Sequence, residues 1–166
     1  MLIVFSGLPG TGKTSVAREL ARTYGAAYLR IDTIEQAIRD CGHEVMEEGY
    51  ETAYRVAADN LRLGLRVVAD SVNGIALTRD AWTDVAQSAA VRLVDVEIVC
   101  SDEVEHRRRL EARASDIAGL APVTWEQVKA REYEPWTRPR IVIDTARRSI
   151  DACIEELMSH LRPMQK

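Results

Sequence analysis

A glycine-rich stretch near the start of the sequence carries the residues whose types and spacing could do chemistry. Residues 7–14 read Gly-Leu-Pro-Gly-Thr-Gly-Lys-Thr and fit the pattern G-x-x-x-x-G-K-S/T of a phosphate-binding loop. Such glycines let backbone N–H groups surround phosphate oxygens, and the following helix N-terminus adds partial positive charge. The pattern predicts that the chain binds a nucleoside triphosphate. The predicted nucleotide-binding residues are Gly7, Leu8, Pro9, Gly10, Thr11, Gly12, Lys13, Thr14 and Ser15.

Two side chains at the end of this loop could contact the triphosphate and its metal ion. Lys13 would reach the β- and γ-phosphates, which makes it a predicted catalytic residue, and the Thr14 hydroxyl would ligate Mg²⁺. We expect Lys13 to be exposed, so that its replacement leaves the fold intact. The context supports the motif, because the apolar run 2–5 is typical of a buried strand and residues 15–24 have helical spacing.

Two aspartates stand at expected strand ends, where parallel α/β sheets bind their ligands. Asp70 closes the apolar run 67–69 and is either a turn residue or a carboxylate that holds Mg²⁺ through water, the role that we favour. Asp32 has two interpretations. Asp32 to Glu35 fits a capping box for the next helix, whereas a carboxylate in the cleft could be a general base for an acceptor hydroxyl. We favour the second, in which Asp32 is catalytic and contacts the substrate.

A charged segment, residues 103–113, is expected to be a helix whose surface is mostly solvated. Arg109 and Arg113 are four residues apart and would share one helix face. The small, glycine-containing stretch after them, about 114–122, is predicted to be a mobile lid. We favour Arg109 and Arg113 as catalytic arginines that stabilise charge on a transferred phosphoryl group. The neighbours are interpreted as ordinary helix or surface residues: His106, Arg107 and Arg108.

Arg79 follows Thr78, a natural N-cap, and would lie in the first turn of a helix, where the helix dipole disfavours a cation. Either a substrate anion compensates, which would make Arg79 substrate-binding, or the side chain extends into solvent. Three aromatic residues flank the expected lid and either stack on a ligand or pack in the core, the second being the default: Trp125, Tyr133 and Trp136.

The order of the remaining elements predicts the fold class. Strands are expected at 2–5, 26–31, 65–69, 93–99 and 140–144. Helices are expected at 15–24, after Asp32 to about 40, and at 50–63, 78–90, 103–113, 124–134 and 150–161. Strands that alternate with helices predict an α/β fold, with a parallel sheet covered on both faces.

Composition limits the classes of protein to consider. The 166 residues suit one domain, and contents of 46% apolar and 29% charged residues are those of a globular protein. A net charge of -4 disfavours nucleic-acid binding, and no apolar run is long enough to span a membrane. A cleaved signal peptide would remove the loop, so we expect none. Three widely spaced cysteines indicate reduced thiols in a cytoplasmic protein.

These residues together resemble the small P-loop kinases of the nucleoside-monophosphate-kinase-like group. The most similar branch contains polynucleotide 5′-kinase, chloramphenicol phosphotransferase, gluconate kinase and zeta-toxin-like proteins, often described as AAA-type ATP-binding proteins. The resemblance covers nearly the whole chain and rests on residues 7–14, Asp32, residues 68–73 with Arg79, and Arg109 with Arg113. Position 30 is Arg, so the Asp-x-Asp pair of shikimate-type kinases is not reproduced.

The resemblance implies a P-loop NTPase fold with three α/β/α layers, sheet order 2-3-1-4-5, a short lid and a single domain over residues 1–166. It also implies ATP with Mg²⁺ as the donor, Asp32 as the base and Arg109 and Arg113 as lid arginines. The function that it favours is transfer of the γ-phosphoryl group to a hydroxyl of a small molecule, by a monomer or a homodimer. Two alternatives remain: a nucleic-acid 5′-hydroxyl kinase, and an ATP-binding switch or ATPase module that drives a partner.

Overall fold

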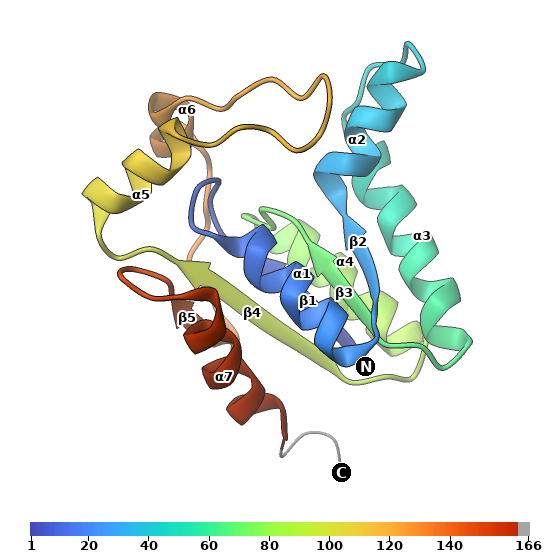
Figure 1. Ribbon diagram of the computed structural model, residues 1–166. Helices are drawn as coiled ribbons and strands as arrows, with labels where there is room; N and C mark the ends of the chain where they lie inside the picture. Colours follow the sequence, from blue (N-terminus) through green and yellow to red (C-terminus); the bar gives the residue numbers. More distant parts are fainter. Residues whose placement is uncertain (163–166) are drawn as a thin grey trace.

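The chain folds into one parallel β-sheet with helices on both faces, in a computed structural model that describes residues 1–162 (Figure 1). The strands are β1 (Leu2–Ser6), β2 (Ala27–Arg30), β3 (Val67–Asp70), β4 (Leu93–Val99) and β5 (Ile141–Asp144). The helices are α1 (Lys13–Tyr24), α2 (Ile31–Asp40), α3 (Glu48–Arg62), α4 (Ala76–Ser88), α5 (Glu103–Glu111), α6 (Trp125–Ala130) and α7 (Ile150–Leu161). The strand order is β2-β3-β1-β4-β5, and the pairings are parallel, which confirms the predicted α/β fold and its sheet order.

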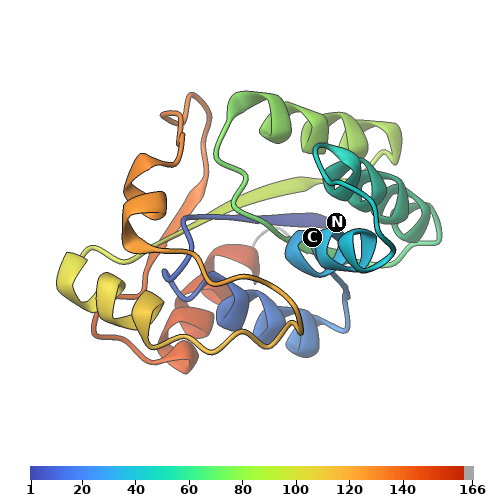
Figure 2. The same cartoon turned by 90° about the horizontal axis from the view of Figure 1, so that it is seen from above.

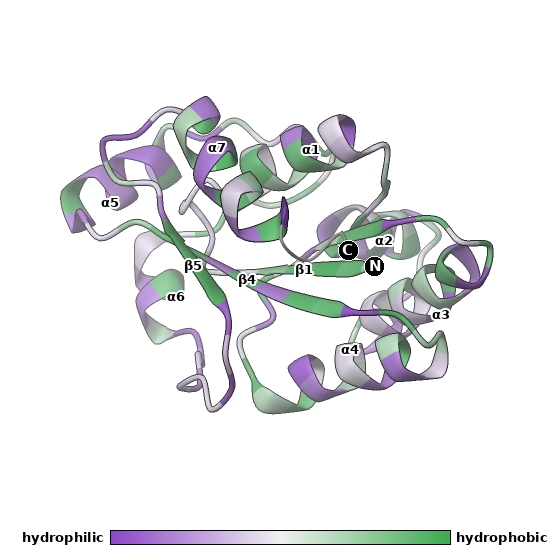
Figure 3. Cartoon of the chain, turned by 90° about the horizontal axis from the view of Figure 1, so that it is seen from below, coloured by the Kyte–Doolittle hydropathy of each residue, from purple (hydrophilic) through white to green (hydrophobic). Residues whose placement is uncertain are grey.

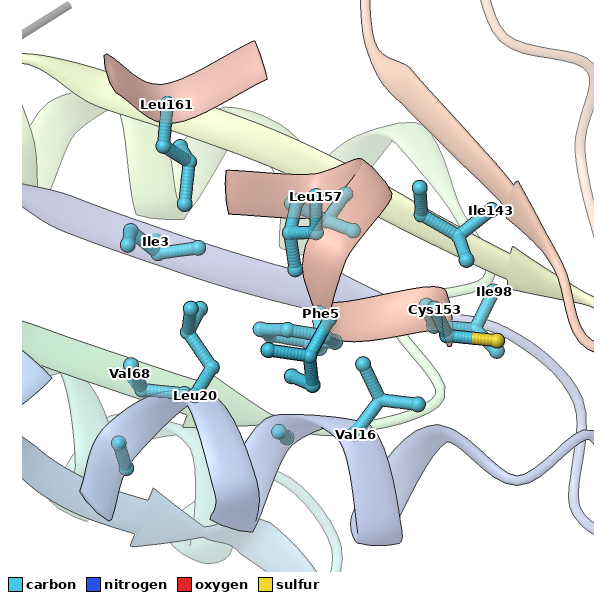
Figure 4. Close-up of a cluster of buried hydrophobic side chains, with 14 of the residues drawn as sticks. Ile3, Phe5, Val16, Leu20, Val68, Ile98, Ile143, Cys153, Leu157 and Leu161 are labelled. Atoms are coloured by element: carbon cyan, nitrogen blue, oxygen red, sulfur yellow. The ribbon is translucent and has the colours of Figure 1, made fainter. Parts of the chain in front are cut away.

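The central strand β1 is buried along its whole length because its side chains point alternately into two cores. Ile3 and Phe5 pack against α1 and α7, and Figure 4 shows Phe5 between side chains of these two helices. Leu2 and Val4 face the opposite core, formed with α3 and α4. Seen from above, the two helix layers lie on either side of the sheet (Figure 2). This two-sided burial explains why the strands are continuous apolar runs.

A third, smaller cluster lies at the carboxyl ends of the strands. Leu110 of α5 packs with Trp125 and Val128 of α6, and Leu8 of the phosphate loop and Val123 pack against this group. Figure 3 shows hydrophobic residues in the strands, whereas α5 is largely hydrophilic. The cluster therefore joins the phosphate loop to the segment that carries the expected lid. Within residues 1–162, no helix is long and apolar enough to cross a membrane.

Helices α1 to α4 each begin about two residues earlier than the sequence predicts, and for α2 and α4 this changes the N-cap. β2 runs directly into α2, whose N-cap is Arg30, so Asp32 lies inside the first turn and the predicted capping box at Asp32 is wrong. The N-cap of α4 is Ile75 rather than Thr78. There the backbone N–H of Ala76 donates to the Glu134 carboxylate at 2.6 Å, a cap supplied from a distant part of the chain.

Two other helices are shorter than predicted. The capping box of Thr124 and Gln127 that starts α6 is confirmed, but the helix ends at Ala130, because Arg131 takes an extended backbone conformation. Helix α5 ends at Glu111, so Arg113 lies beyond it and does not share a helix face with Arg109.

Candidate functional site

The phosphate loop joins β1 to α1 and depends on glycine at three positions. Gly7, Gly10 and Gly12 have φ angles of 144°, 88° and 88°, in the region that side chains rarely adopt. A Cβ on Gly7 would lie 2.3 Å from the carbonyl oxygen of Ile98 in β4. The loop is therefore pressed against the sheet at Gly7, where space requires glycine, and the backbone conformation favours glycine at all three positions.

Lys13, the first residue of α1, is buried, contrary to the exposed position predicted from the sequence. Its Nζ lies 2.8 Å from Oδ1 of Asp70 at the end of β3, and the Tyr28 hydroxyl donates to Oδ2 of Asp70 at 2.7 Å. Burial raises the pKa of Asp70, but the charge of Lys13 and hydrogen bonds from Lys13, Tyr28 and Thr14 outweigh it and leave that pKa below its ordinary value. Asp70 is therefore an ionised carboxylate next to Thr14.

Thr14 and Asp70 are suited in chemistry to the predicted Mg²⁺. They offer a hydroxyl and a carboxylate, which are hard oxygen donors, and Mg²⁺ typically binds one or two protein oxygens together with phosphates and water. Among residues 1–162, no group of three or more His, Cys, Asp or Glu side chains could hold a metal ion. The donor set fits a metal that is bound together with a nucleotide.

His106 and Thr145 support the phosphate loop from behind, a role that the sequence did not reveal. The Nε2 of His106 lies 2.8 Å from the Pro9 carbonyl oxygen, and its buried ring packs edge-on against Trp125. The hydroxyl of buried Thr145, just after β5, donates to the Thr11 carbonyl at 2.7 Å. A histidine in a charged helix reads as a surface residue, so only the fold reveals that His106 faces the loop.

A cavity of about 490 Å³ lies along the phosphate loop and the start of α7. Its lining contains one acidic residue, Asp116, and five basic residues: Lys13, Arg18, Arg109, Arg113 and Arg148. This excess of positive charge is notable because the whole chain has a net charge of -4. The cavity is suited to a polyanion such as a nucleoside triphosphate.

A second cavity, of about 420 Å³, lies between α2 and the segment 119–123. Asp32 lines it, and its side chain is 37% exposed. The two cavities share Pro9, Lys13 and Arg113. Lys13 and Arg113 therefore stand at the boundary between a cavity along the phosphate loop and a cavity that contains the part-exposed carboxylate of Asp32.

Arg109 and Arg113 line the first cavity together, although only Arg109 lies in α5. Arg109 is held in place, because it donates to Glu105 at 2.7 Å and to the hydroxyl and carbonyl oxygens of Thr145, both at 2.9 Å. The exposed Arg113 guanidinium, in contrast, has no hydrogen bond or ion pair within residues 1–162. The two arginines thus differ in how firmly they are positioned.

Arg79 lies apart from the other predicted site residues. It is buried and donates to the backbone carbonyls of residues 73, 74, 134 and 135 at 2.9–3.3 Å. Its guanidinium also stacks on Trp136, 4.0 Å from the ring centroid, and lies over Tyr133. Among the described residues, Arg79 is not part of either cavity lining. This placement favours a structural role for Arg79, and it also accounts for the packing of both aromatic residues.

Comparison with known proteins identifies a matching family and several relatives of the chain. Residues 2–151 match the family model described as AAA domain, AAA_33. A shikimate kinase of Frankia casuarinae is 30% identical over 169 residues, which cover 98% of this chain and 73% of that protein. An uncharacterized protein of Mycobacterium tuberculosis is 30% identical over 161 residues, and the match spans 32% of its length.

Solved structures of kinases share the fold. A gluconokinase from Sinorhizobium meliloti has a TM-score of 0.69 at 17% identity and covers 98% of this chain and 91% of its own. The APS kinase of Mycobacterium tuberculosis, solved with AMPPNP and APS, has a TM-score of 0.69 at 22% identity and covers 96% of both chains. The family match and the shikimate kinase relative show that the chain belongs to the AAA_33 family of P-loop kinases.

Proposed function

We propose that this protein transfers the γ-phosphoryl group of ATP to a hydroxyl of a small molecule. The observation that carries the proposal is the meeting of the two cavities at Lys13 and Arg113. A donor bound along the phosphate loop would direct its terminal phosphate toward this boundary, and an acceptor in the second cavity would approach from the other side. Two reactants held in this way react in one closed site, from which a lid at about 114–122 would exclude water.

Each of the proposed site residues has a defined task. Lys13 binds the β- and γ-phosphates, and Arg113 stabilises the charge that spreads over the transferred group. Asp32 accepts the proton of the acceptor hydroxyl as that oxygen attacks phosphorus. Thr14 and Asp70 would hold Mg²⁺, which neutralises charge on the phosphate oxygens when it is bound.

The charge of the second cavity suggests the chemistry of the acceptor. Its lining contains four basic residues, Lys13, Arg39, Arg113 and Arg131, and two acidic residues, Asp32 and Glu35. Arg39 is paired with Glu35 at 3.0 Å, whereas the Arg131 guanidinium has no hydrogen bond or ion pair within residues 1–162. We propose that the acceptor carries an acidic group in addition to its hydroxyl, and that Arg131 binds this group.

The two alternatives have less support. A nucleic-acid 5′-hydroxyl kinase would need a basic track for the phosphate backbone, but the net charge is -4 and the second cavity has the volume of a small molecule. An ATPase or switch module would hydrolyse ATP without an acceptor. The second cavity with its part-exposed Asp32 carboxylate favours a reaction that has an acceptor.

A screen of ATP consumption tests the proposal. Purified protein with Mg²⁺-ATP is mixed with hydroxy acids, the matching amides, neutral sugars, nucleosides, antibiotics and oligonucleotides with free 5′-hydroxyls. We expect stimulation by a hydroxy acid and less by its amide, with the preference reduced in Arg131→Ala. Stimulation by oligonucleotides alone would favour the first alternative. An ATPase rate that no acceptor changes would contradict the proposal and favour the second.

A further inference from the structure

Arg30 is a buried arginine at the junction of β2 and α2, with a carboxylate on either side. Its side chain is 2% exposed. Nη1 donates to both carboxylate oxygens of Asp116, at 2.9 and 3.0 Å. Nη2 lies 3.6 Å from Oδ2 of Asp32, close enough for an ion pair but without a hydrogen bond. Nε and Nη2 are buried and have no hydrogen-bond partner within residues 1–162. Arg30 therefore donates to Asp116 through Nη1 alone, and it lies near Asp32 without a hydrogen bond.

The carboxylate that Arg30 binds belongs to the lid. Asp116 lies in the segment 114–122 and also accepts a hydrogen bond from Arg18 of α1. The next part of the lid rests on α2, since a Cβ on Gly119 would lie 2.9 Å from Nε2 of Gln36. Figure 1 shows this segment extending from α5 and α6 toward α2. The lid is therefore closed in this structure, and the contacts of Asp116 with Arg30 and Arg18 hold it in that position.

Opening of the lid would change the surroundings of Arg30. Asp116 would leave with the lid, and a buried guanidinium without a carboxylate is strongly unfavourable. Within residues 1–162, the two carboxylates at ion-pair distance from Arg30 are Asp116 and Asp32. A small rotation of the guanidinium would bring Nη2 into hydrogen bonding with Asp32 and satisfy a donor that is unpaired when the lid is closed.

We propose that Arg30 is a positioning residue that exchanges between Asp116 and Asp32 as the lid closes and opens. With the lid open, Arg30 donates a hydrogen bond to the carboxylate of Asp32. With the lid closed, Asp116 accepts the hydrogen bonds of Arg30, and Asp32, 3.6 Å from Nη2, receives no hydrogen bond from Arg30 and can accept a proton from the acceptor. The role of Asp32 as the base rests on the proposed function, whereas the competition of the two aspartates for one arginine rests on geometry alone.

The exchange makes a specific prediction about lid opening in the free protein. The measurement is hydrogen–deuterium exchange of residues 114–122 by mass spectrometry, with neither nucleotide nor acceptor present. Asp116→Asn should accelerate exchange roughly tenfold or more, because one partner of a hydrogen-bonded charge pair is lost. Arg18→Ala should have a smaller effect, since the Arg18–Asp116 contact is exposed. Asp32→Asn should slow exchange, because the open state loses its substitute partner.

Control variants separate this competition from a local change in structure. Asp32 and Asp116 are part-exposed, with side chains 37% and 41% accessible, so these variants should fold. Glu111→Gln removes a carboxylate beside the lid that pairs with Arg107, and it should leave lid exchange unchanged. In an Asp116→Asn background, Asp32→Asn should no longer slow exchange, because there is no lid carboxylate left to compete.

Unchanged or faster lid exchange in Asp32→Asn would overturn the proposal, as would an equal effect of Asp32→Asn with and without Asp116. The proposed function is tested separately, by the turnover of the same Asp32→Asn variant with an acceptor. Slower lid exchange with normal turnover would support the competition and reject Asp32 as the base. Lost turnover with unchanged lid exchange would support Asp32 as the base and reject the competition between the two aspartates.

Discussion

Nη1 of Arg109 lies 2.9 Å from the hydroxyl oxygen of Thr145, and that hydroxyl donates to the carbonyl of Thr11 in the phosphate loop. Arg109 is therefore positioned before any ligand binds, and its position is tied to the loop. Arg113 lies beyond the end of α5, at the boundary of the two cavities. Replacement of Arg109 and replacement of Arg113 should therefore affect the protein differently.

Arg113→Ala should lower kcat more than it raises the KM for ATP. The Arg113 guanidinium is not held by other residues, so its main contact would form with the phosphoryl group during transfer, where charge is greatest. Steady-state kinetics with an active acceptor provide the measurement, with a decrease in kcat of roughly 10²-fold or more. Arg107→Ala is the control, because Arg107 is exposed and pairs with Glu111. Similar small effects of both changes would contradict the assigned role.

Asp32→Asn should lose most of kcat and keep its affinity for ATP. The proposed base acts on the acceptor, so the defect belongs to the chemical step, with a loss of ~10²-fold or more. ATP affinity measured by calorimetry should stay close to that of wild type, because Asp32 lines the second cavity and not the first. Unchanged turnover would show that Asp32 only supports the first turn of α2.

His106→Leu should weaken nucleotide binding. His106 contacts the Pro9 carbonyl and packs against Trp125, and leucine keeps much of the packing but cannot make the hydrogen bond. Loss of one hydrogen bond to a loop that must be ordered suggests a loss of affinity of roughly five- to tenfold. Calorimetric titration with Mg²⁺-ATP is the measurement, and Arg108→Ala, a solvent-exposed change on the same helix, is the control. Equal affinity in all three proteins would show that the contact is dispensable.

Lys13→Met should abolish phosphoryl transfer and also destabilise the free protein. Removing Lys13 leaves the buried Asp70 carboxylate without its cation, which typically costs about 3–5 kcal/mol of unfolding free energy. Urea denaturation measures this loss. The double variant Lys13→Met with Asp70→Asn should regain much of the stability, because no buried charge is left alone, but it should remain inactive. A single variant as stable as wild type would show that the pair contributes little to folding.

The lid contact predicts a pH dependence of stability. Desolvation raises the pKa of Asp116, but hydrogen bonds and charges of Arg30 and Arg18 lower that pKa to about 2. A carboxyl whose pKa is lower in the folded state stabilises the fold above its unfolded pKa of about 3.9, and this contribution is lost as pH falls through about 2. The difference in unfolding free energy between wild type and Asp116→Asn should be constant from pH 7 to about 5 and decrease below about 4. A difference that does not change with pH would argue against the ion pairs.

The sequence predicted the elements well because their signals are local. A glycine-rich loop, apolar periodicity and the Thr124 capping box each depend on neighbouring residues, and the order of strands and helices then indicated the fold. The sheet order followed from the family resemblance and is confirmed.

Three of the errors share one physical cause, which is contact between distant residues. The N-terminal cap of α4 comes from Glu134, 58 positions away from Ala76, and no local sequence pattern predicts it. Lys13 looked exposed because its partner, Asp70, is 57 positions away. His106 belongs by sequence to a solvated helix, and only the packing of α5 against the phosphate loop brings it to Pro9.

The walls of the two cavities come largely from different parts of the chain, although both contain Pro9, Lys13 and Arg113. The first is lined mainly by the phosphate loop, α1, the start of α7 and residues between 109 and 116, whereas the second is lined largely by α2 and the segment 119–123. Substitutions on α2 could therefore reshape the proposed acceptor cavity without touching the residues that line the proposed nucleotide cavity. Such a layout lets one donor chemistry be kept while acceptor preference diverges, and it identifies Glu35, Gln36 and Arg39 as the positions at which an engineered change of acceptor should begin.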